Sequence, residues 1–191
     1  MTAQLILASA SPRRRELLDQ IQVRYLVKPV DLDETPLPNE SPKEYVQRVA
    51  AEKSAACALQ CRSNLPVLAA DTSVVLGDVI MGKPRNQDDA IAMLRQLSGQ
   101  THQVMTALSL RGHQHWQALT VTEVTFRQLT DTEIVAYWNT GEPLDKAGSY
   151  AIQGLGGIFV ESLKGSFSGV VGLPLFETAE LLAKQGIEFF K

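Results

Sequence analysis

Several features that mark common classes of protein are scarce in this sequence. Aromatic residues make up 6% of it and the formal net charge is −3, so it lacks the basic, aromatic-rich surface typical of proteins that bind single-stranded nucleic acid. Cys57 and Cys61 are the only cysteines, which argues against a disulfide framework and a zinc knuckle. A chain of this charge is expected to bind an anion in a local pocket rather than over a basic surface.

Long apolar runs are scarce as well. The segment MTAQLILASASPRRREL has its few apolar residues before its basic ones, which fits neither a secretory signal nor a membrane-spanning helix. We therefore expect a cytoplasmic protein without a membrane partner. The phosphate-binding pattern GxxxxGK[ST] is absent, and the glycines of residues 154–157 lack the strand and helix that frame a dinucleotide-binding motif.

The chain nevertheless has enough apolar side chains for a substantial core. Of its 191 residues, 45% are hydrophobic, which suffices for one domain or for two lobes that share a sheet. No internal repeat, low-complexity segment or linker divides it. We expect a single domain over residues 1–191.

A carboxylate interrupts the apolar stretch of residues 66–84. Asp71 and Thr72 stand between apolar runs of the kind that fill a strand covered on both faces. An ionised carboxylate buried there without a partner would be costly, so a cation, a metal ion or hydrogen-bond donors should lie beside Asp71. A structural ion pair and a functional carboxylate both fit this pattern.

Lys83 is a candidate partner close by in the sequence. Gly77-Asp78 has the composition of a two-residue hairpin turn, which would bring the chain back alongside Asp71. Regular register would put Lys83 and Asp71 on opposite faces, and a bulge at Gly82 would bring them together.

Further cationic residues occur at the start of a predicted helix, where the helix dipole does not favour positive charge. Residues 4–9 predict a strand, and Ser11-Pro12 predicts a helix start with Ser11 as the N-cap. The first turn holds three arginines, although the positive end of the helix dipole favours acidic residues. A strand, a short turn and an arginine-rich helix N-terminus together indicate a phosphate site formed by Arg13 and Arg14, while Arg15 is expected in solvent.

A capping box at Ser41 and Glu44 predicts a long helix that ends near Arg62. Lys53 falls on the apolar stripe of this helix. Its ammonium either reaches solvent along the helix surface or enters the site that Asp71 lines.

The loop before this helix carries Asp31, Asp33 and Glu34. Acidic residues in such a loop either keep it soluble or hold a hard cation such as magnesium, which takes one or two carboxylates and substrate oxygens. Glu34 is the candidate ligand.

The remaining elements are predicted from capping and turn residues. Asn86 predicts a helix that Ser98-Gly99 ends, and Thr130 with Glu133 predicts a helix that Gly141 ends. Two antiparallel strands are expected over residues 103–111 and 116–127, a glycine-rich segment over 144–174, and a last helix over 175–184.

Several short motifs occur in a fixed order along the chain: Ser9, the SPRR of residues 11–14, Glu52-Lys53, Ala70-Asp71-Thr72, Gly82-Lys83-Pro84, Ser98-Gly99 and Ala151-Ile152-Gln153-Gly154. With these motifs the sequence resembles the Maf family of nucleotide pyrophosphatases over nearly its whole length. The resemblance implies an α/β fold with an elongated mixed sheet, flanking helices and two lobes around a central cleft, as in the inosine triphosphate pyrophosphatase architecture. It also implies hydrolysis of a nucleoside triphosphate to the monophosphate and pyrophosphate, with a divalent cation, magnesium or manganese.

Arg13, Thr72 and Gln153 match the pattern of the family's dTTP/UTP pyrophosphatase branch. A sister branch that acts on 7-methyl-GTP carries Trp, Gln and Glu at these positions. The resemblance further implies removal of excess or non-standard nucleotides and a link to cell division arrest. A non-catalytic nucleotide-binding regulator of cell division and a 7-methyl-GTP pyrophosphatase remain alternatives. A homodimer is one assembly that the chain could form.

The residue patterns and the resemblance agree on the roles of the site residues. The triphosphate would be held by four cations, Arg13, Arg14, Lys53 and Lys83, which stabilise the charge that develops on it. Asp71 would act as the general base for water, or share that water with the metal ion. Ser9 and Glu34 would complete the phosphate and metal shell, and Thr72 and Gln153 would face the base.

Overall fold

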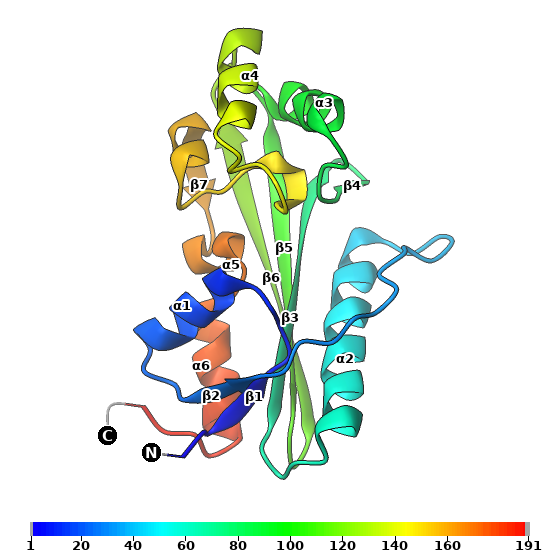
Figure 1. The fold of residues 1–191 in the computed structure, drawn as a ribbon, viewed down its shortest axis with the longest axis vertical. Helices are drawn as coiled ribbons and strands as arrows, with labels where there is room; N and C mark the ends of the chain where they lie inside the picture. Colours follow the sequence, from blue (N-terminus) through cyan, green and yellow to red (C-terminus); the bar gives the residue numbers. More distant parts are fainter. Residues whose placement is uncertain (1, 190–191) are drawn as a thin grey trace.

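The computed structural model describes residues 2–189, which are organised around one seven-stranded mixed sheet (Figure 1). The strand order is β2-β1-β3-β5-β6-β7, and β4 pairs with β3 outside this path. The strands are β1 (Leu5–Leu7), β2 (Tyr25–Val27), β3 (Val67–Leu76), β4 (Val79–Met81), β5 (Thr101–Arg111), β6 (His115–Phe126) and β7 (Val160–Lys164).

The helices divide between the two faces and one end of the sheet. They are α1 (Pro12–Gln20), α2 (Pro42–Cys61), α3 (Gln87–Leu97), α4 (Asp131–Asn139), α5 (Phe167–Val171) and α6 (Leu175–Lys184), with 3₁₀ turns η1 (Ala147–Ser149) and η2 (Leu155–Phe159). Figure 1 shows α2 beside one face of the long strands and α1, α5 and α6 on the other side, while α3 and α4 lie at the far end. The long strands β3, β5 and β6 thus join two lobes, as the resemblance implies.

The core follows the apolar patterns of the sequence. Under α2, the buried residues Val46, Val49 and Ala50 pack with Val75 and Met105 of the sheet. The larger cluster fills the other face and continues into the lobe of α3 and α4. No helix among residues 2–189 is long and apolar enough to cross a membrane.

Most of the predicted helix starts are confirmed. Both capping boxes form, at Ser41 with Glu44 and at Thr130 with Glu133, and the Asn86 side chain caps α3. The Ser11 prediction is wrong in one respect, because its side chain makes no capping hydrogen bond. Its backbone N–H instead donates to Ser9 Oγ at 3.2 Å, which ties the start of α1 to the end of β1.

The hairpin at Gly77-Asp78 is confirmed, with Leu76 opposite Val79. The predicted bulge at Gly82 is wrong, because the β4 pairing ends at Met81. Within the glycine-rich segment the structure adds β7, α5 and the two 3₁₀ turns, which the sequence patterns did not predict.

One edge of β3 is open in its middle. On one side β3 pairs with β5 from Val67 to Val75. On the other side β1 pairs only with Val67 and Leu68, and β4 only with residues 74–76. Among the described residues, 69–73 therefore have a strand neighbour on one side only, and Asp71 and Thr72 lie at this gap.

Candidate active site

A cavity of about 800 Å³ lies at the open edge of β3. Its walls come from the segment after β1, the start of α1, the loop before α2, and residues 145–153 and 170–172. All of the site residues predicted from the sequence line it: Ser9, Arg13, Arg14, Glu34, Lys53, Asp71, Thr72, Lys83 and Gln153. The fold therefore brings together residues that are up to 144 positions apart, from Ser9 to Gln153.

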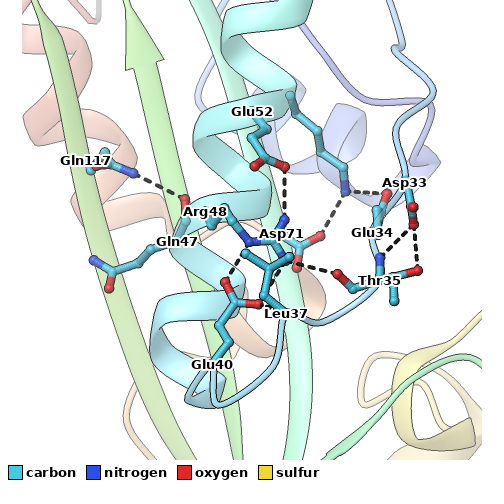
Figure 2. A network of polar contacts seen from close by, with 11 residues as sticks. Asp33, Glu34, Thr35, Leu37, Glu40, Gln47, Arg48, Glu52, Asp71 and Gln117 are labelled. Atoms are coloured by element: carbon cyan, nitrogen blue, oxygen red, sulfur yellow. Dashed lines mark hydrogen bonds and ion pairs between the residues drawn. The ribbon is translucent and has the colours of Figure 1, made fainter.

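Asp71 is buried on the α2 side of this cavity. Successive side chains of a strand point to opposite faces, so Asp71 and Thr72 line different walls of the cavity. Lys53 Nζ lies 2.8 Å from Asp71 Oδ1 and 2.9 Å from Glu34 Oε1; Figure 2 labels both acidic residues and marks these two ion pairs with dashed lines. The side chains of Lys53 and Asp71 are 12% and 9% exposed, so Lys53 enters the Asp71 site rather than solvent.

The prediction that Lys83 is the partner of Asp71 is wrong. Lys53 takes that place because α2 packs across β3 and carries the lysine to the carboxylate. Lys83 follows the end of β4, is exposed and lines the cavity, and among residues 2–189 it forms no ion pair.

The loop that carries Glu34 is fastened to α2 by Arg48 (Figure 2). The guanidinium donates to Glu40 at 2.6 and 2.9 Å, to Glu52 at 3.0 Å and to the Thr35 carbonyl at 3.2 Å. The hydrogen bonds from Arg48 lower the pKa of Glu40 to about 2, so this carboxylate stays ionised at neutral pH. The loop is thereby held against the helix that also carries Lys53.

Of the three acids in this loop, Glu34 alone lines the cavity. Asp33 Oδ1 is engaged by Thr35, whose N–H donates at 3.0 Å and whose hydroxyl donates at 2.6 Å. The placement agrees with the choice of Glu34 as the candidate metal ligand.

Arg14 organises the opposite wall. Its Nε donates to the Gly172 carbonyl at 2.8 Å, and its two terminal nitrogens donate to Ser9 Oγ and Thr72 Oγ1, each at 3.2 Å. Among the described residues no carboxylate forms an ion pair with it. Burial lowers the pKa of Arg14, and the negative charge of Asp71 opposes this shift. A guanidinium held in this way favours an anion in the cavity.

Three further cations approach the cavity together, namely Arg13, Lys83 and Lys146. Arg13 Nε donates to the Val171 carbonyl at 3.3 Å, so its terminal nitrogens are not used by that bond. Burial, and then the positive charges of Arg13 and Lys83, lower the pKa of Lys146. Mutual repulsion of this kind is relieved when an anion binds between the cations.

Gln153 is exposed at the cavity wall, in a segment with its own anchor. The Glu142 carboxylate accepts hydrogen bonds from Leu155 N–H and Gly156 N–H, both at 2.9 Å, and from Tyr137 Oη at 2.7 Å. Tyr137 Oη accepts in turn from Ala151 N–H at 3.1 Å. These bonds fix the turn on which Gln153 stands.

Sequence reasoning missed Lys146 and Tyr45 as lining residues. Burial, and then the negative charges of Asp71 and Glu34, raise the pKa of Tyr45 to about 12, so its hydroxyl remains a donor. The only available signal for Tyr45 was its place two turns before Lys53 on the same helix. Lys146 gave no signal, because a lysine in a glycine-rich segment is commonly a solvent-exposed residue.

The donor set fits a magnesium or manganese ion that is shared with a substrate. Glu34 and Asp71 contact one ammonium group, so their carboxylates converge on one region of the cavity. Residues 2–189 contain no cluster of three or more His, Cys, Asp or Glu side chains that would hold a metal by themselves. Magnesium ordinarily takes one or two carboxylates and completes its shell with phosphate oxygens and water.

Comparison with known proteins agrees with this architecture. Residues 4–185 match the family model described as Maf-like protein. A dTTP/UTP pyrophosphatase of Methylococcus capsulatus is 55% identical over 184 residues, which cover 96% of this chain and 91% of that protein. A dTTP/UTP pyrophosphatase of Pseudoalteromonas atlantica is 53% identical over 187 residues, which cover 96% of this chain and 97% of that protein.

The fold is similar to a solved HAM1 protein from Coxiella burnetii. The TM-score is 0.55 over 96% of this chain and 100% of that one, at 14% sequence identity. At this identity the similarity concerns the fold alone. The predicted α/β architecture with an elongated mixed sheet is confirmed.

Proposed function

The chain belongs to the Maf-like protein family, and from that premise we propose that it hydrolyses dTTP and UTP to the monophosphate and pyrophosphate. The observation that carries the proposal is the cavity at the open edge of β3. One wall presents the Lys53–Asp71 pair, and the other presents the Arg14 guanidinium, which has no carboxylate partner among the described residues. A carboxylate base and an anion site that face one cavity are what hydrolysis of a phosphoanhydride requires.

The triphosphate is assigned to the cationic walls. Arg14 is held by three hydrogen bonds in a fixed orientation, and Arg13, Lys83 and Lys146 add positive charge around it. Fixed donors of this kind stabilise charge that grows on the α-phosphate and on the leaving pyrophosphate without having to reorganise. Ser9 offers its hydroxyl to the same phosphates.

Asp71 is assigned as the general base. Its Oδ1 accepts from Lys53 at 2.8 Å, and its Oδ2, which makes no hydrogen bond within residues 2–189, is assigned to accept a proton from water. Through this ion pair Lys53 also keeps the Asp71 carboxylate in a fixed orientation. A water molecule at Oδ2 would attack the α-phosphorus and release pyrophosphate.

A divalent cation is assigned to Glu34 and Asp71 together with phosphate oxygens. When bound, such an ion neutralises negative charge on the triphosphate and lowers the pKa of coordinated water. Arg48 keeps Glu34 in reach of this position by holding its loop on α2.

The base is assigned to Thr72 and Gln153. A neutral amide carries both a donor and an acceptor, which can match the alternating carbonyl and N–H edge of uracil or thymine. The curated relatives named dTTP/UTP pyrophosphatase support this choice over the 7-methyl-GTP branch.

The decisive experiment measures pyrophosphate release from dTTP, UTP, CTP, GTP and 7-methyl-GTP, with magnesium, with manganese and with chelator. We expect dTTP and UTP to be hydrolysed fastest, and chelator to stop turnover. Binding of nucleotide without release of pyrophosphate would favour the non-catalytic regulator, and preference for 7-methyl-GTP would overturn the branch assignment. The cytoplasmic location, a homodimer and a link to cell division arrest stay predictions.

A further inference from the structure

Two hydroxyl groups of the cavity both accept a hydrogen bond from Arg14, those of Ser9 and Thr72. Ser9 Oγ accepts a second bond from the backbone N–H of Ser11 at 3.2 Å. Both lone pairs of Ser9 are then in use, and only its proton remains for a ligand. This polarity suits a phosphate oxygen, which accepts.

Thr72 offers a ligand the opposite hydrogen-bonding role, that of an acceptor, because of its contact with Thr106. The two threonines stand directly opposite each other on β3 and β5, and Thr106 is 1% exposed. Thr106 Oγ1 donates its single hydroxyl proton to the Gly169 carbonyl at 2.7 Å. In the 3.0 Å contact between the two hydroxyls, Thr72 must therefore be the donor.

Both ends of this chain of hydrogen bonds are fixed. The Arg14 guanidinium can only donate and the Gly169 carbonyl can only accept, so the hydroxyls between them cannot exchange roles. Thr72 gives its proton to Thr106 and one lone pair to Arg14. What it presents to the cavity is one remaining lone pair, which fits a donor on a ligand and disfavours a phosphate oxygen.

We propose that Thr106 is a specificity-determining positioning residue, which fixes Thr72 as an acceptor for the N3–H of uracil or thymine. Cytosine carries an acceptor at N3, so the lone pairs of Thr72 and cytosine would face each other unpaired. A site rejects a ligand that leaves its buried polar groups without partners. The inference rests on the proposed function, because it requires a pyrimidine triphosphate with its base at Thr72. Thr106 itself does not line the cavity.

The test compares kcat/KM for UTP and for CTP in three variants. Thr106→Val keeps the shape of the side chain but removes the hydroxyl, which frees the Thr72 proton to face cytosine N3. We expect the UTP to CTP ratio to fall about ten-fold, the size of one hydrogen bond. Thr106→Ser keeps the hydroxyl and should restore the wild-type ratio. Thr125→Val is the matched control, because it breaks another cross-strand threonine pair, Thr101 with Thr125 at 2.8 Å, outside the cavity.

An unchanged ratio in Thr106→Val, with UTP still hydrolysed, would overturn the proposal. So would a wild-type protein that hydrolyses UTP and CTP equally well. Failure of the wild type to release pyrophosphate from any pyrimidine triphosphate would instead refute the proposed function.

A second measurement does not depend on the folding of Thr106→Val. In N3-methyl-UTP a methyl group replaces the N3 proton, so no donor remains for Thr72. The wild type should use this analogue at least about ten-fold less efficiently than UTP. Equal use of the two nucleotides would overturn the assignment of Thr72 as the acceptor for N3–H.

Discussion

Replacing Asp71 by asparagine tests the chemistry of the site with little change in shape. The substitution removes the negative charge and the capacity to take a proton from water. Loss of a general base typically lowers the rate about 100- to 10,000-fold, and we expect kcat for UTP to fall within this range. Nucleotide binding should change much less, because Arg14 and the other cations lie on other parts of the wall.

The structure also indicates how stability should respond. Breaking a buried ion pair usually costs about 3 to 5 kcal/mol when the remaining charge is left alone. Lys53 is not left alone in Asp71→Asn, since Glu34 stays 2.9 Å away and the amide oxygen can replace Oδ1. We therefore expect a loss of about 1 kcal/mol, the size of one ordinary hydrogen bond.

The assay is pyrophosphate release under single-turnover and steady-state conditions, with thermal unfolding and nucleotide binding measured on the same samples. Asp33→Asn is the matched control, because Asp33 lies next to Glu34 but bonds to Thr35 and does not line the cavity. The control should retain turnover within about two-fold, in the range of ordinary surface substitutions. If Asp71→Asn keeps more than about a tenth of the wild-type kcat, the general-base assignment is wrong.

The parts of the fold that could be predicted are those encoded by neighbouring residues. The capping boxes at Ser41 and Thr130 depend on side chains three positions apart, and the hairpin depends on Gly77-Asp78. Such signals need no knowledge of tertiary structure. The structure confirms both capping boxes and the hairpin.

At Ser11 the local signal fails. Its position before Pro12 predicts a side-chain cap, yet its side chain makes no capping hydrogen bond, and its backbone N–H donates to Ser9 Oγ, which Arg14 also engages. The start of α1 is thus shaped by the anion site as well as by helix propensity. A local rule that fails at a cluster of cations is itself a sign of function.

The sequence offered both Lys83 and Lys53 for the Asp71 site and could not decide between them, because the choice depends on packing between elements. Lys83 is near in sequence, but the pairing of β4 with β3 ends at Met81, so the hairpin does not carry Lys83 back to Asp71. Lys53 lies 18 positions before Asp71 on a different element, and the placement of α2 across β3 brings its ammonium group to 2.8 Å from the carboxylate. The position of Lys53 on the apolar stripe was the one visible sign, since a charged group on a buried face calls for a buried partner.

Three further perturbations test other parts of the structure. Gln153→Glu should lower the UTP to GTP ratio of kcat/KM about ten-fold, since a carboxylate can only accept; an unchanged ratio would mean that Gln153 does not read the base. Burial lowers the pKa of His102 from 6.5 to about 4, so the unfolded chain binds more protons between these values and stability should fall as pH drops from 6.5 to 4; His102→Gln should flatten this slope in thermal unfolding scans. Arg48→Ala releases the loop that carries Glu34, because it removes the bonds to Glu40 and to the Thr35 carbonyl. We expect it to raise the magnesium concentration needed for half-maximal turnover several-fold while kcat at saturating magnesium falls less, since Asp71 and Lys53 stay in place. Arg85→Ala, which removes the ion pair between the 84% exposed Arg85 side chain and Asp89 of α3, should leave both values unchanged. An equal magnesium requirement in Arg48→Ala and the wild type would show that the loop does not position a metal ligand.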